Sequence, residues 1–175
     1  MAARLLEQFD ISEDEIRRIV AGAVEGADDG ELFVEYREGE ALVFDNGHLK
    51  TANFNAERGF GLRAVAGEAV GYAHSGELSE AALRRAAGAV AAVKGGYSGT
   101  LAEAPAGTNR RLYGEENPIA EPGFEQKAKL LQEIDAWLRA KDPRVRQVTA
   151  SLAASWQQVE ILRADGRMAR DIRPL

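Results

Sequence analysis

The sequence contains no cysteine and only two histidines in 175 residues. The lack of cysteine excludes thiol nucleophiles, disulfides and cysteine-based zinc sites, and it fits a reducing compartment. No apolar run near the N-terminus is long enough for a signal peptide, and no later run approaches the length of a membrane span. We therefore expect a soluble, cytoplasmic protein with no membrane partner.

Positive charge is also in short supply. The chain has 22 Lys and Arg against 28 Asp and Glu, which gives a formal net charge of −6. Non-specific nucleic-acid binding depends on a concentrated basic surface, so we expect no nucleic-acid partner. Arginines do cluster near the C-terminus, and we interpret this group as a solvated strand face that serves solubility: Arg163, Arg167, Arg170 and Arg173.

An antiparallel meander of four or five strands is predicted between residues 31 and 75. Apolar and polar side chains alternate from Leu32 to Phe44 with the period of two that is typical of a half-buried strand. Asn46-Gly47 predicts a tight hairpin turn, because Asn tolerates a left-handed backbone and is followed by Gly. Further strands are predicted over residues 49–54, 59–65 and 69–74.

Two helices are predicted to flank this meander in the sequence. Ser12 and Glu15 have the form of a capping box, and the apolar positions that follow at helical spacing run as far as the stop signal at 28–30. Ser79 is the expected N-cap of an alanine-rich helix that ends at Gly95-Gly96. We place this second helix on the apolar face of the meander, because its small side chains allow close packing.

The C-terminal part predicts a third helix and more strands. The helix runs from Phe124 to Asp142, where the following proline disfavours helical geometry. Residues 145–162 predict two strands, and a turn at 164–166 leads into another strand whose alternation continues to Leu175. We therefore expect the natural chain to extend further. The predicted apolar stripe of the third helix comprises Phe124, Lys127/Ala128, Leu131, Ile134 and Leu138.

Together these elements predict an α+β fold, in which an antiparallel meander sheet is packed by amphipathic helices and followed by further C-terminal strands. We divide the chain into 1–96, with the first two helices and the meander; 97–123, a linker or loop without periodicity; and 124–175, a helix with antiparallel strands. We expect the last segment to join the same domain, with the order of its strands left open.

No pattern predicts a catalytic group. Gly59-Phe60-Gly61 begins like a dinucleotide-binding fingerprint, but the last glycine is missing and a strand follows where a helix is needed. Such glycines within a strand permit a bend, a bulge or the close approach of another backbone. His48 and His74 belong to no metal-binding motif, so we interpret them as exposed or satisfied histidines. The acidic pairs 28–29 and 115–116 are interpreted as solvated.

No serine lies in a nucleophile elbow either, because no G-x-S-x-G occurs in the chain. We therefore assign no catalytic, cofactor-binding or metal-binding residue.

Several of these features in combination resemble the N-terminal region of the TldD/PmbA proteins, a family also described as modulators of DNA gyrase. The shared features are a hairpin after the acidic-glycine turn at 28–30, the strand with Gly59, Gly61 and Arg63, the AGEAVGYA hairpin at 66–73, and the alanine-rich helix after it. The later helix and strands also agree with the layout of the family.

The resemblance implies a cytoplasmic zinc-dependent peptidase that acts on small or unfolded polypeptides, as a homodimer or with a related second subunit. In the family, the metal-binding motif, of H-E-x-x-x-H form, lies after the N-terminal region, and no stretch of this sequence matches it. We therefore expect no cofactor in this chain and zinc only in the part of the family protein that follows. The chain by itself is expected to be inactive.

Two functions remain open from the sequence. The first is an N-terminal scaffold that encloses the substrate of such a peptidase and offers a sheet edge to an extended peptide. The alternative is a free-standing protein- or peptide-binding module without peptidase activity, with residues 97–123 as its contact loop.

Overall fold

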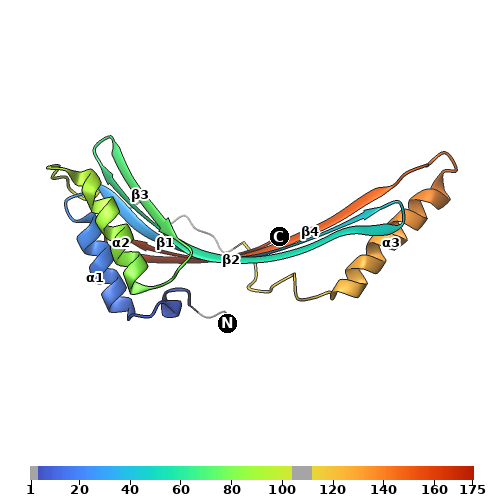
Figure 1. Ribbon diagram of the computed structural model, residues 1–175, viewed down its shortest axis with the longest axis horizontal. Helices are drawn as coiled ribbons and strands as arrows, with labels where there is room; N and C mark the ends of the chain where they lie inside the picture. Colours follow the sequence, from blue (N-terminus) through green and yellow to red (C-terminus); the bar gives the residue numbers. More distant parts are fainter. Residues whose placement is uncertain (1–3, 104–111) are drawn as a thin grey trace. The chain divides into compact units, whose positions relative to one another are not determined.

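The computed structural model describes residues 4–103 and 112–175, so the expected linker at 97–123 falls partly outside the described residues. It has an α+β fold with an open, antiparallel sheet of five strands in the order β3-β2-β1-β4-β5 (Figure 1), which confirms the predicted fold class. The helices are α1 (Glu13–Val24), α2 (Glu80–Ala91) and α3 (Phe124–Lys141), with short 3-10 helices η1 (Leu6–Gln8) and η2 (Ala92–Lys94). The strands are β1 (Asp29–Asp45), β2 (His48–Ala66), β3 (Ala69–Ser75), β4 (Thr149–Arg163) and β5 (Met168–Pro174).

The meander has three strands, the long β1 and β2 and the shorter β3, where four or five were predicted. The hairpin turn is where the sequence placed it, with φ angles of 57° at Asn46 and 80° at Gly47. The strands on either side continue through polar stretches at which the sequence predicts breaks, because backbone pairing does not require an apolar face. For the same reason, residues 149–163 form one strand instead of the two expected.

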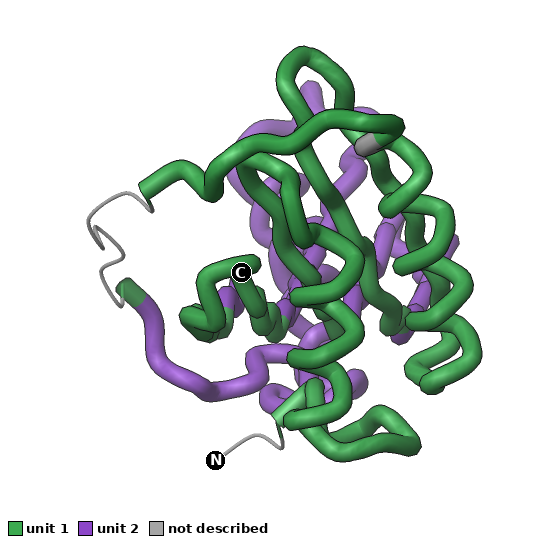
Figure 2. Tube along the Cα trace, turned by 90° about the vertical axis from the view of Figure 1, so that its left-hand side faces the viewer, with its two compact units in different colours: residues 1–36, 57–112, 158–172 green, residues 37–56, 113–157, 173–175 purple. Residues whose placement is uncertain are grey.

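The chain divides into two compact units, coloured green and purple in Figure 2. Because of their length, β1, β2 and β4 contribute residues to both units. No helix within the described residues has both the length and the apolar character needed to cross a membrane. Unit 1 comprises residues 1–36, 57–112 and 158–172, and unit 2 comprises residues 37–56, 113–157 and 173–175.

In unit 1, α1 and α2 pack against each other and against one face of the sheet. Ser12 and Ser79 cap them as predicted, since their hydroxyl oxygens accept from the amides of Glu15 and Ala82, each at 3.2 Å. α1 ends at Val24, before the predicted stop, because the backbone turns at a glycine with a positive φ of 75°. The buried core of the unit includes Ile16, Val20, Leu32, Val34, Phe60, Leu62, Ala64, Leu83, Val90 and Leu162.

In unit 2, α3 packs on Leu42 and Phe44 of β1 through Leu131. The predicted apolar stripe of this helix is partly wrong. Phe124 is 49% exposed and Ile134 is 37% exposed, whereas Asp135, which lies outside the predicted stripe, is buried. Lys127 and Leu131, which belong to the predicted stripe, are buried as expected. The burial of charge is possible because Lys127 and Asp135 each have an ionic partner within the unit.

Candidate functional site

The face of the unit 1 sheet opposite α1 and α2, here called the open face, carries the polar side chains of this unit that are most densely connected. Successive residues of a strand point to opposite faces. Leu32 and Val34 are buried against the helices, so Asp29 and Glu31 project from the open face. The same alternation places Arg63 of β2 and Arg163 of β4 on the open face, next to residues that are buried in the core.

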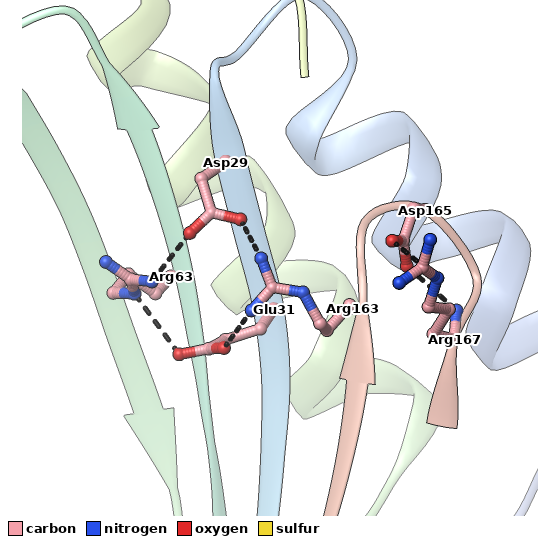
Figure 3. A network of polar contacts seen from close by, with 6 residues as sticks. All are labelled: Asp29, Glu31, Arg63, Arg163, Asp165 and Arg167. Atoms are coloured by element: carbon pink, nitrogen blue, oxygen red, sulfur yellow. Dashed lines mark hydrogen bonds and ion pairs between the residues drawn. The ribbon is translucent and has the colours of Figure 1, made fainter. Parts of the chain in front are cut away.

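These four side chains form a closed charge ring across three neighbouring strands (Figure 3). Arg63 lies 3.0 Å from Asp29 Oδ2 and 3.3 Å from Glu31 Oε1. Arg163 reaches the other oxygens of the same carboxylates, at 2.7 Å from Asp29 Oδ1 and 3.6 Å from Glu31 Oε2. The side chains are 26–35% exposed, so the ring is partly desolvated.

The charge ring is suited to holding strands together and not to catalysis. It has two carboxylates and two guanidinium groups, so its formal net charge is zero. Each carboxylate already lies between two cations, which leaves neither one free as a general base or as a metal ligand. Within residues 4–103 and 112–175 no group of three or more His, Cys, Asp or Glu could hold a metal ion. These residues therefore do not fit a zinc site, and we derive no chemical step through zinc.

Two interpretations of charged residues need correction here. Asp29 and Arg163 were expected to be solvated, but they are members of the ring. Asp28 is also engaged, because its carboxylate accepts from the Tyr97 hydroxyl at 2.7 Å and from the Gly67 amide at 2.7 Å. The hydrogen bond to Asp28 raises the pKa of the Tyr97 phenol above its ordinary value.

Two of the other C-terminal arginines also lie next to carboxylates. Arg167 lies 3.3 Å from Asp165 in the hairpin that joins β4 to β5 (Figure 3). Arg170 approaches Glu160 at 3.6 Å, and Glu160, only 1% exposed, accepts from the Leu6 amide at 3.0 Å. The arginine cluster therefore serves the interior of the unit as well as its surface.

The glycines of the rejected dinucleotide motif lie in β2, where they allow close approach. A Cβ atom at Gly59 would lie 2.7 Å from the carbonyl oxygen of Ser75. A Cβ atom at Gly61 would lie 2.7 Å from the hydroxyl of Tyr72, whose ring stacks on His74 with centroids 5.9 Å apart. The structural interpretation of these glycines is confirmed. His48 and His74 are both exposed, as expected.

Unit 2 has a shallow trough of about 450 Å³ on its sheet. Its floor carries small side chains such as Gly39 and Ala153, and two amides, Asn53 and Asn55, line it as well. Arg37 and Glu40 also line it, and the Glu40 carboxylate is already paired with the ammonium group of Lys127. The trough therefore has room for a ligand, and its acidic side chain is already engaged in an ion pair.

Comparison with known families identifies the class of proteins to which this α+β chain belongs. Residues 30–94 match the model of PmbA/TldA metallopeptidase domain 1, and residues 117–175 match that of the PmbA/TldA metallopeptidase central domain. The chain belongs to the PmbA/TldD metallopeptidase family. This confirms the resemblance seen in the sequence.

Curated relatives agree with this assignment. The chain is 35% identical over 152 residues to a metalloprotease TldD homolog of Haemophilus influenzae, covering 85% of this chain and 31% of the relative. It is 32% identical over 151 residues to a TldD homolog of Buchnera aphidicola from Acyrthosiphon pisum, covering 84% and 31%. The chain therefore spans about a third of the length of these relatives.

Solved structures show the same fold. A protein of Bacteroides thetaiotaomicron, described as a proposed modulator of DNA gyrase, superposes with a TM-score of 0.70 at 11% identity, over 94% of this chain and 40% of that one. TldE from Thermococcus kodakarensis gives a TM-score of 0.60 at 16% identity, over 93% and 36%.

Proposed function

We propose that this chain is the N-terminal scaffold of a cytoplasmic zinc metallopeptidase of the TldD/PmbA type, in which it helps to enclose small or unfolded peptide substrates. The proposal rests mainly on one observation: the chain matches domain 1 of the family and then its central domain. It does so while spanning only 31% of the length of its curated relatives. The scaffold role is supported by the charge ring, which uses its carboxylates to connect strands and not to activate water.

In this proposal the reactive centre is supplied by the polypeptide that follows in the family. Zinc bound there would polarise the scissile carbonyl and activate water. The sheet would contribute an edge to which an extended peptide could add through main-chain hydrogen bonds, which do not read side-chain sequence. The partner would be an identical or a related second subunit.

The isolated chain provides the test. The purified 175-residue protein, supplied with zinc, should neither retain an equimolar amount of the metal nor cleave an unfolded peptide such as reduced, alkylated casein. Cleavage that a chelator abolishes and zinc restores would contradict the proposal. Two results together would favour the alternative of a free-standing binding module. The chain would bind such peptides tightly, and it would not restore activity when combined with the catalytic part of a family member.

A further inference from the structure

The trough of unit 2 combines one positive charge with two carboxamides. It lies over three neighbouring strands, β2, β1 and β4. Arg37, Asn53 and Asn55 line it, and all three side chains are exposed. Within residues 4–103 and 112–175 no ion pair or side-chain hydrogen bond engages any of the three. Their polar groups are therefore available to a ligand.

The trough lies on the face of this sheet that points away from α3. Glu40 pairs with Lys127 of α3, and successive residues of a strand point to opposite faces, so Gly39 and Ala41 face the trough. Arg37, two positions before Gly39, shares their face. It is the only Lys or Arg among the described residues that line the trough. The trough therefore presents one positive charge that its own acidic side chain does not neutralise.

The two carboxamides are spaced like the polar groups of an extended backbone. Asn53 and Asn55 are two positions apart on β2, so they project from the same face about 6.7 Å apart. A Cβ atom at Gly39 would lie 2.7 Å from Oδ1 of Asn55, so the Asn55 side chain lies across Gly39. Each carboxamide offers an acceptor and two donors. The main-chain groups along one edge of an extended peptide also repeat every two residues, and they can pair with both carboxamides.

We propose that this trough binds an extended peptide that carries a carboxylate, with Asn53 and Asn55 hydrogen-bonded to its main chain and Arg37 paired with the carboxylate. A guanidinium group can hold a carboxylate through two parallel hydrogen bonds. The small side chains of Ala41 and Ala153 let a backbone lie close to the sheet. A phosphate group fits less well, because it carries about two negative charges and the trough supplies one cation.

The order of these groups along the trough fits such a peptide. The two strands are antiparallel and Asn55 lies across Gly39, so Arg37 lies beyond Asn55 when the trough is followed from Asn53. A carboxylate that follows two bound main-chain groups therefore reaches Arg37. Both a C-terminal carboxylate and an acidic side chain provide this chemistry. The inference rests on the proposed function only in that the ligand is a peptide, and its test measures binding without cleavage.

The ligand is tested with a short, unstructured peptide in three forms: with a free C-terminal carboxylate, with a C-terminal amide, and with a C-terminal amide and one added glutamate. Titration into the isotope-labelled chain is followed by NMR through the side-chain amide signals of Asn53 and Asn55. At least one carboxylate form should bind about tenfold more tightly than the plain amide, and the form that does so identifies the source of the carboxylate. Equal binding of all three forms would overturn the proposal.

The site is tested with matched variants. Arg37→Gln should remove the preference for the carboxylate, and Arg146→Gln, at an exposed arginine of unit 2 outside the trough, should retain it. Asn55→Ala should weaken all three forms by about threefold, because it removes a neutral hydrogen-bonding group. Circular dichroism verifies that each variant is folded.

Leu175 also lines the trough, so its terminal carboxylate needs a control of its own. A chain extended by a few glycine and serine residues after Leu175 moves this charge away and should bind the peptide at least as tightly. A carboxylate preference that survives Arg37→Gln would overturn the proposal, and so would binding that leaves the Asn53 and Asn55 signals unchanged. Failure of the proposed function would appear separately, as a lack of peptide cleavage by the family protein that contains this chain.

Discussion

The side chain of Lys127 on α3 is 3% exposed, and its ammonium group donates to the carboxylate of Glu40 on β1. It also donates to the carbonyl oxygen of Ile119 at 2.8 Å, so the buried cation has two acceptors within unit 2. Removing one partner of such a pair leaves an uncompensated charge. Substitution of either residue alone is therefore expected to destabilise this unit.

Lys127→Ala should lower the free energy of unfolding of unit 2 by about 3 kcal/mol. The double variant Lys127→Met/Glu40→Leu should lose clearly less, because no charge is left without a partner. Urea unfolding followed by tryptophan fluorescence measures this, since both tryptophans, Trp137 and Trp156, lie in unit 2. A single variant as stable as the parent chain would show that Glu40 does not need Lys127.

Gly59 and Gly61 give a matched pair of substitutions two positions apart on β2. In Gly59→Ala the new methyl group would lie 2.7 Å from the backbone oxygen of Ser75, which cannot move without disturbing the pairing with β3. In Gly61→Ala it meets the hydroxyl end of Tyr72, an exposed side chain that can rotate. Gly59→Ala should destabilise by about 1–3 kcal/mol, and Gly61→Ala by less than about 0.5 kcal/mol. Thermal unfolding followed by circular dichroism compares them, and equal losses would contradict the difference in packing.

The charge ring should show strong coupling between its two arginines. Arg63→Met or Arg163→Met alone leaves both carboxylates with one cation, and each should lower stability by about 0.5–1 kcal/mol. The double variant leaves Asp29 and Glu31 facing each other without a cation, so its loss should exceed the sum of the single losses by about 1 kcal/mol. A double-mutant cycle in urea, followed by circular dichroism, measures the coupling. Simple additivity would mean that the ring does not act as a unit.

The stability of unit 2 is expected to depend on pH through the carboxyl group of Asp45. Hydrogen bonds from Gln147 at 3.1 Å and Thr149 at 2.9 Å, and then from Lys50, hold the pKa of this carboxyl below its ordinary value. A depressed pKa means that the stabilising contribution is complete above the ordinary pKa of aspartate, about 4, and is lost as pH falls through the folded-state value.

Asp45→Asn should therefore lower the urea midpoint near neutral pH, and the difference from the parent chain should shrink as the solution is acidified below about pH 4. Urea titrations at a series of pH values measure this difference through the fluorescence of unit 2. Asp165→Asn is a control in unit 1 and should leave the unit 2 midpoint unchanged. A difference at Asp45 that grows in acid would have the wrong sign.

Local signals in the sequence predicted the elements that local chemistry determines. Ser12 and Ser79 cap their helices, and Asn46-Gly47 turns the first hairpin, because each depends only on residues a few positions away. The number of strands was wrong, since polar stretches can stay paired when a neighbouring strand is present. The sequence placed Lys127 on the buried stripe of α3, but its pairing with Glu40 could not be predicted, because the two residues are 87 positions apart.

The charge ring was missed for the same reason. Asp29 and Arg163 are 134 positions apart, and they meet only because β4 pairs beside β1. The signal that could have pointed to the ring is the alternation of Asp29 and Glu31 with buried apolar residues, since it places two carboxylates on one strand face. To find their partners, one needs the strand order, which a single sequence does not give.

In the proposed function, this chain is the scaffold of a peptidase, and the reactive centre lies in the polypeptide that follows this region in the family. The most direct measurement is peptide cleavage by a chimera in which this chain replaces the matching 152-residue region of the Haemophilus influenzae relative. That relative without the region is the control and should be inactive. We expect the chimera to cleave the peptides that the relative cleaves. A folded, zinc-loaded chimera without this activity would contradict it.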